Sequence, residues 1–179
     1  MTNVKKIFDE NISPVGFKEW GYDKSLREIL DTCDNESWLL WILSVVLGTN
    51  DTLFIYIKSK CANTIRHIIK NQEVLNLIDS GFLLWDNSIS YLNYIDIKQK
   101  AEKEQTKASE LALSTKDNQL YLNYCLQSIS SRWIHDNDGY SSFKLSVELD
   151  NAINPTSIPY SQIKNEIIYI IKNNTLHLN

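Results

Sequence analysis

The sequence predicts an all-α fold, a single-domain irregular helical bundle of about six to eight helices over residues 1–179. Apolar residues recur at steps of three and four along most of the chain, which is the helical period. The chain has only five glycines and three prolines, whereas sandwiches and barrels need many turns. Its length and its hydrophobic fraction of 43% are those of one globular domain that buries a continuous core.

The first 22 residues have a mixed character and contain Pro14 and two glycines. We expect a short helix followed by a loop, in a loosely packed N-terminal segment. Asp23 then caps a helix whose apolar residues share one face. Those residues are Leu26, Ile29 and Leu30. This helix is expected to end near residues 33–35.

Residues 36–47 form the most apolar segment and are predicted to be a buried central helix. The segment is apolar on all sides and is followed by Gly48, which suits the C′ position of a helix. A helix without a polar face belongs at the centre of a bundle. The apolar run Trp38–Leu47 is about half the length needed to cross a bilayer, so no membrane span is expected.

A second cap at Asp51 predicts a helix that runs to Ile69. Residues 53–57 are β-branched enough for a strand, but the helical period continues for three further turns and decides for a helix. The apolar stripe consists of Leu53, Ile57, Cys61, Ile65, Ile68 and Ile69. A short helix from Glu73 to Ser80, ended by Gly81, is predicted to follow, with residues 82–85 packing across the core.

The second half of the chain predicts four further helices. A long segment begins at Asp86 or Ser88 and reaches about Thr115, with a solvated, mixed-charge middle. Asp117 or Asn118 caps the next helix, and two shorter ones cover residues 143–152 and 161–173. The core stripe of the helix after Asn118 is Leu122, Cys125, Leu126, Ile129 and Trp133.

Composition and motifs argue against several classes of protein. The net charge is −4, the pI is about 5.4, and only three arginines occur, so a nucleic-acid partner is not expected. No cluster of glycines suits a phosphate loop, and no catalytic residues, metal site or cofactor are predicted. The three cysteines form no C-x-x-C pair, and no apolar signal segment follows Met1, so a reduced cytoplasmic protein is the default.

The segment from Trp133 to Tyr140 is the one dense patch of functional residue types. Asp136 and Asp138 could occupy the third and fifth positions of a calcium loop, but its first position would be Ile134 and its twelfth Leu145. A helix-ending turn rich in Asx chemistry, or half of a metal or acid/base site, remain open. As a candidate partner-binding site we take Trp133, His135, Asp136, Asp138 and Tyr140.

The stretch Cys33–Leu43, with its Trp-Leu-Leu-Trp sequence, resembles a pattern in bacterial immunity proteins of polymorphic-toxin systems. The following helix in that group often has a Cys-Ala pair and a later arginine, matched here by Cys61-Ala62 and Arg66. A tryptophan after the next short helix is matched by Trp85. The residue matches run from about Asp34 to Trp85, and the layout of helices is similar over most of the chain.

The resemblance implies a helical, non-enzymatic immunity protein that binds a cognate toxin and covers its active site. It carries over no binding residues, since such proteins recognise different toxins through variable surfaces. Two other hypotheses stay open from the residues alone. One is a helical enzyme or small-ligand-binding domain that uses an unrecognised carboxylate site, and the other is a structural, self-assembling subunit.

Overall fold

The computed structural model describes residues 4–135, 140–154 and 157–178, and all of their regular structure is helical. The all-α prediction is confirmed. The described residues form ten helices, more than the expected six to eight, and residues 4–21 contribute two short helices where one was predicted. The helices are α1 (Val4–Glu10), α2 (Phe17–Gly21), α3 (Leu26–Thr32), α4 (Glu36–Leu47), α5 (Thr52–Asn63), α6 (Gln72–Trp85), α7 (Tyr91–Ser114), α8 (Asn118–His135), α9 (Tyr140–Ile153) and α10 (Tyr160–Asn174).

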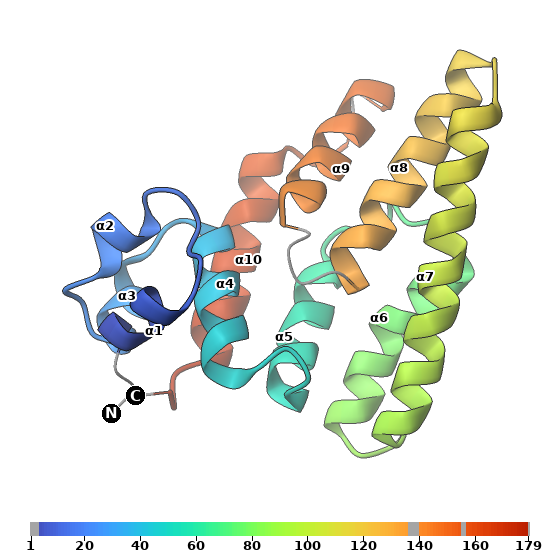
Figure 1. Cartoon of the computed structure of the whole chain (residues 1–179). Coiled ribbons are helices and arrows are strands. Elements are labelled where there is room, and N and C mark those ends of the chain that lie inside the picture. The colour runs from blue at the N-terminus through green and yellow to red at the C-terminus, as the bar shows by residue number, and fades with distance from the viewer. Residues whose placement is uncertain (1–3, 136–139, 155–156, 179) are drawn as a thin grey trace.

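The helices form a row of packed neighbours (Figure 1). Short helices α1 to α3 gather at one end of the molecule, beside α4. Helices α4, α5 and α10 pack against one another in the middle, and α6 lies on α5. Helices α6, α7, α8 and α9 then follow as successive contacting pairs. In the described part of the chain, no helix is both long and apolar enough to cross a bilayer.

Helices α1 and α2 of the N-terminal segment are packed on the core, which corrects the expectation of a loose segment, whereas Ile12 and Val15 between them are exposed. Phe8 and Phe17 are 2% and 0% exposed. The Phe17 ring stacks on Trp38 at 4.9 Å, and the Phe8 ring stacks on Trp41 at 5.7 Å. The aromatic side chains of α4 therefore bury α1 and α2 instead of leaving them at the surface.

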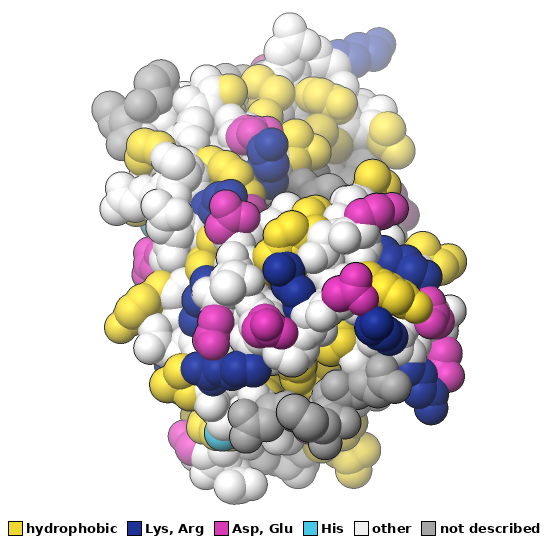
Figure 2. All heavy atoms as spheres, turned by 90° about the vertical axis from the view of Figure 1, so that its left-hand side faces the viewer, with side chains coloured by type: hydrophobic (Ala, Val, Ile, Leu, Met, Phe, Trp, Pro, Cys, Tyr) yellow, Lys and Arg dark blue, Asp and Glu magenta, His cyan; other side chains and the backbone are white. Residues whose placement is uncertain are grey.

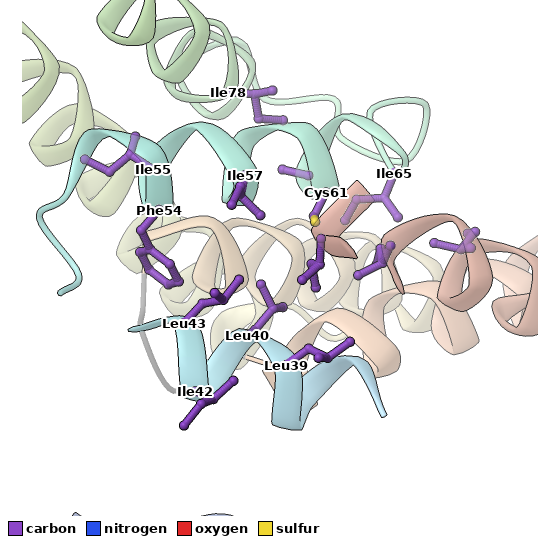
Figure 3. Close-up of a cluster of buried hydrophobic side chains, with 14 of the residues drawn as sticks. Leu39, Leu40, Ile42, Leu43, Phe54, Ile55, Ile57, Cys61, Ile65 and Ile78 are labelled. Atoms are coloured by element: carbon purple, nitrogen blue, oxygen red, sulfur yellow. The ribbon is translucent and has the colours of Figure 1, made fainter. Parts of the chain in front are cut away.

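Helix α4 packs between the N-terminal helices and the pair α5 and α10. Asn35 caps its first turn through Ser37 N and Trp38 N, and Gly48 follows its end with φ of 87°. Leu39, Leu40 and Leu43 point toward α5 in Figure 3, whereas Ile42 points the other way. Because α4 buries side chains on opposite sides, apolar residues are needed all around this helix.

Helix α3 begins two residues later than predicted, because Ser25 caps it and Asp23 does not. The Ser25 side chain accepts a hydrogen bond from Glu28 N, and the Glu28 carboxylate accepts one from Ser25 N at 2.7 Å. This reciprocal pair is a capping box, which satisfies two backbone donors at once. Asp23 instead lies 2.8 Å from the ammonium group of Lys5.

Helix α5 begins at the predicted Asp51 cap but ends at Asn63, six residues before the predicted end. Residues 64–69 continue as turns with i→i+3 hydrogen bonds, such as Ile65 N to Ala62 O and Ile68 N to Ile65 O. Tight turns of this kind repeat every three residues, close enough to the helical period to be taken for it. Ile65, Ile68 and Ile69 are buried as the stripe predicts.

Helix α6 passes through Gly81 and ends at Trp85, so the predicted stop at Gly81 is wrong. A Cβ atom at residue 81 would lie 1.9 Å from Ser59 Oγ and 2.7 Å from Ser59 Cβ. Glycine is thus present because α5 and α6 approach closely, and not as a helix end. The long helix α7 starts later than predicted, with Ser90 as its cap.

The two ends of the described chain lie side by side in Figure 1. Arg27 Nη1 donates to Leu176 O at 3.0 Å, and Lys172 Nζ donates to Asp31 O at 2.7 Å. Ile163, Ile167 and Ile171 of α10 are buried. The C-terminal helix α10 therefore belongs to the same core as the N-terminal helices.

Candidate functional site

The predicted partner-binding residues between Trp133 and Tyr140 lie within or next to residues 136–139, which the structure does not describe. Trp133 and His135 belong to the end of α8, and Tyr140 begins α9. Asp136 and Asp138 lie outside the described residues. Partner binding through this cluster therefore stays a prediction.

A different group of side chains forms a partly exposed aromatic surface on α5 and α6. Tyr56 stacks on Trp85 with ring centroids 4.9 Å apart, and it meets Phe82 edge to face at 5.9 Å. Trp85 is 44% exposed, and the neighbouring Leu83 is 41% exposed. We call Tyr56, Phe82 and Trp85 the aromatic face. Its three rings are in contact, so it presents one continuous apolar surface to solvent.

A lysine places positive charge on this aromatic face. Lys60 lies one turn after Tyr56 on α5, and its Nζ atom is 4.8 Å from the centre of the Tyr56 ring. The same Nζ donates to Asn174 Oδ1 at 3.4 Å. The cation is held over the ring by electrostatic attraction and by this hydrogen bond. The Tyr56 ring thus contacts both Lys60 and Trp85.

A hollow of about 210 Å³ continues the surface toward α10. Phe82 belongs both to the aromatic face and to the lining of this hollow. The full lining is Lys60, Asn63, Thr64, Phe82, Glu166 and Ile170. Pockets for small molecules usually measure about 300–1,000 Å³, so this hollow is closer in size to one side chain of a partner. Its lining offers an ammonium, a carboxylate and an aromatic ring.

The sequence contained part of the signal for this surface. Tyr56 and Lys60 are four residues apart, and Phe82 and Trp85 are three apart, so each pair shares one helix face. The chain gives no local sign that these two faces adjoin, because that depends on the packing of α5 against α6. The glycine at residue 81, which permits that close packing, indicates a helix end when the sequence is taken alone.

Titratable side chains converge at one buried place, where α4 and α10 meet. Glu36 is only 4% exposed, and its Oε1 atom accepts a hydrogen bond from the Tyr160 hydroxyl. Lys164 Nζ lies 3.9 Å from Glu36 Oε2. Burial, followed by the hydrogen bond to Glu36, raises the pKa of Tyr160 above its usual range. Both carboxylate oxygens are engaged, so this cluster works as a link between two helices.

Two of the three cysteines, Cys33 and Cys61, are buried and poorly placed for thiol chemistry. Burial raises the pKa of the Cys33 thiol and of the Cys61 thiol, which lowers the fraction present as reactive thiolate. Within the described part of the chain, no three His, Cys, Asp or Glu side chains are grouped so that they could hold a metal ion.

The surface charge is mixed on the face turned to the viewer in Figure 2. Basic and acidic side chains alternate there with hydrophobic ones, in keeping with a net charge of −4. Lys5–Asp23 and Lys18–Asp9 are ion pairs of the N-terminal helices, each at 2.8 Å. Paired charges of this kind are poorly suited to contact a continuous phosphate backbone.

The aromatic face and its hollow combine partly exposed aromatic rings with charged groups, which are residue types common at protein interfaces. No protein-family model, curated protein or solved structure matches this chain.

Proposed function

We propose that this chain is a non-enzymatic protein-binding domain, an immunity protein that neutralises a cognate bacterial toxin in the cytoplasm by direct binding. The observation that carries the proposal is the aromatic face, where Tyr56, Phe82 and Trp85 form one partly exposed surface beside a hollow. Tryptophan and tyrosine are the residues that most often dominate binding energy at protein interfaces. The resemblance of residues 34–85 to immunity proteins covers the same helices.

The proposed mechanism is steric. The aromatic face inserts its exposed tryptophan against an apolar site on the toxin, and the hollow accepts one side chain from the toxin in return. Lys60 and Glu166 stand in the hollow and select a partner with opposite charges at matching positions. The helical body then covers the toxin's active site, so the chain needs no catalytic group of its own.

Co-expression with the toxin encoded beside this gene tests the proposal. We expect the two proteins to co-purify as a stable complex and the host cells to resume growth. Trp85→Ala removes the exposed anchor and is expected to weaken the complex by roughly 2 kcal/mol or more, about 30-fold in Kd, as measured by titration calorimetry.

Tyr121→Ala provides the matched control, since Tyr121 is an aromatic residue of similar exposure, 46%, on α8. It should leave toxin affinity unchanged. If neither a complex nor growth rescue is found, the immunity function is wrong. If Tyr121→Ala weakens binding and Trp85→Ala does not, the toxin is bound elsewhere on the chain.

A further inference from the structure

The hollow between α5, α6 and α10 contains two charged side chains, of which only the positive one already has partners. Lys60 Nζ lies over the Tyr56 ring and donates to Asn174 Oδ1. Glu166 is exposed on α10, and in the part of the chain that the structure describes its carboxylate accepts no hydrogen bond and forms no ion pair. The charge that remains for an incoming group is therefore the negative one.

The uncharged polar groups of the hollow add further hydrogen-bond acceptors. Thr64 Oγ1 donates its proton to Cys61 O at 2.7 Å, so only its lone pairs are left. The side-chain amide of Asn63 makes no hydrogen bond within the described residues, and its oxygen can accept one. Together with the Glu166 carboxylate, these oxygens match a group that carries several N–H donors and no acceptor.

The position of the hollow at the end of α5 also favours a cation. Asn63 is the last residue of α5, and Thr64 is its C-cap. The carbonyl groups at a helix C-terminus carry partial negative charge, which attracts cations. The helix end and the Glu166 carboxylate thus act in the same direction, as does the net charge of −4 of the whole chain.

The aromatic wall of the hollow distinguishes between the possible cations. Phe82 lines the hollow, and its ring meets Tyr56 edge to face. A guanidinium group is planar and can stack on such a ring while its N–H donors reach carboxylate and amide oxygens, whereas an ammonium group has no plane to stack. An acidic side chain would meet the like charge of Glu166.

We infer that the hollow binds an arginine side chain of the protein partner, with the guanidinium facing the Glu166 carboxylate and stacked on the Phe82 ring. The inference names the toxin side chain that enters the hollow, so it rests on the proposed function. Arginine is one of the residues, with tryptophan and tyrosine, that most often dominate binding energy at interfaces. When the partner covers the hollow and excludes water, the charge-assisted hydrogen bonds to Glu166 become stronger.

Nuclear magnetic resonance of the purified full chain tests the hollow without the toxin. The probe is N-acetyl-arginine amide, which should shift the amide signals of Asn63 and Thr64 in a saturable way, with a millimolar Kd as expected for so small a ligand. N-acetyl-citrulline amide has nearly the same shape but no charge, and it should leave these signals in place. Equal or larger shifts with N-acetyl-lysine amide would overturn the choice of arginine.

Glu166→Gln removes the negative charge and keeps the size of the side chain. It should weaken arginine binding in the hollow about tenfold. Glu110→Gln is the matched control, because Glu110 is also exposed, forms no ion pair among the described residues, and lies on α7, which does not line the hollow. An absence of arginine shifts, or an equal loss in the two variants, would overturn the inference.

The toxin complex separates this inference from the proposed function. By titration calorimetry, Glu166→Gln should weaken toxin binding, and Glu110→Gln should not. A complex that depends on Trp85 but not on Glu166 would overturn the inference and leave the immunity function in place. Arginine shifts in the hollow without any toxin complex would instead contradict the immunity function, while the preference of the hollow for arginine would stand.

Discussion

At residue 81 the chain carries glycine where α5 and α6 come into contact. The position of a Cβ atom there is occupied by Ser59, whose Oγ atom would be 1.9 Å away. The residue has no unusual backbone angle to explain glycine, since it lies inside α6. Because glycine has only a hydrogen atom in place of a side chain, α5 and α6 can approach closely at this residue. These are the two helices that carry the aromatic face.

Gly81→Ala should destabilise the protein, because the helices must separate or Ser59 must move. Overpacking of this kind costs about 1–3 kcal/mol, even though alanine is a better helix former than glycine. Urea denaturation followed by circular dichroism measures the change. The double substitution Ser59→Gly with Gly81→Ala moves the small residue to the other helix and should recover much of the loss. An unchanged stability in the single variant would show that α5 and α6 do not approach as described.

At the scale of helices, caps decide where most elements begin. Asn35, Asp51 and Asn71 each accept hydrogen bonds from two backbone amides of the following turn. These local bonds involve residues two and three positions apart, so a sequence reveals them directly. The predicted cap at Asp51 is accordingly correct, whereas Asp23 was expected to cap α3 in the place that Ser25 takes.

The ends of helices and the candidate site were less predictable, because they depend on distant contacts. Residues 64–69 keep the buried spacing of a helix while forming turns, and Gly81 looks like a stop while serving a contact with Ser59. The aromatic face needs Tyr56 and Trp85 to meet across two helices. Nothing within either segment encodes that pairing. The fold class could thus be predicted from period and composition, and the site could not.

Asp51→Ala tests the cap of α5. The Asp51 carboxylate accepts from Leu53 N at 2.8 Å and from Phe54 N at 3.3 Å. Loss of these bonds should cost about 1 kcal/mol in the free energy of unfolding. Asp51→Asn keeps an acceptor in the same place and should lose much less, by thermal or urea unfolding. Equal losses in the two variants would mean that the charge of Asp51, and not its hydrogen bonds, supports the helix.

Over the whole molecule, a single core links helices from both ends of the sequence. Phe17 of α2, Leu43 of α4, Ile57 of α5 and Ile167 of α10 are all fully buried members of it. Stability is therefore a property of the complete array, and a change in one buried group should appear in global unfolding.

The buried phenol of Tyr94 makes global stability fall at high pH. Burial, with smaller effects of Tyr91 and Glu102, raises the pKa of Tyr94 to about 12. In the unfolded chain a tyrosine ionises near pH 10, so between these values only the unfolded state loses the proton. Stability from this group is complete below pH 10 and declines above it, by about 2–3 kcal/mol near pH 12.

Tyr94→Phe isolates this contribution, since phenylalanine keeps the ring and cannot ionise. Urea unfolding at several pH values between about 8 and 11 should show a smaller decline in the variant than in the natural protein. Parallel curves for the two proteins would mean that Tyr94 ionises as easily in the folded state as in the unfolded chain.

The bonds from Arg27 to Leu176 and from Lys172 to Asp31 join parts of the chain that are synthesised far apart in time. While a ribosome makes this protein, α4 emerges before its partner α10, with α5 to α9 between them. Until then the apolar surface of α4 has no permanent cover on that side. Contacts of such large sequence separation form slowly, so this side of α4 is expected to be covered late in folding.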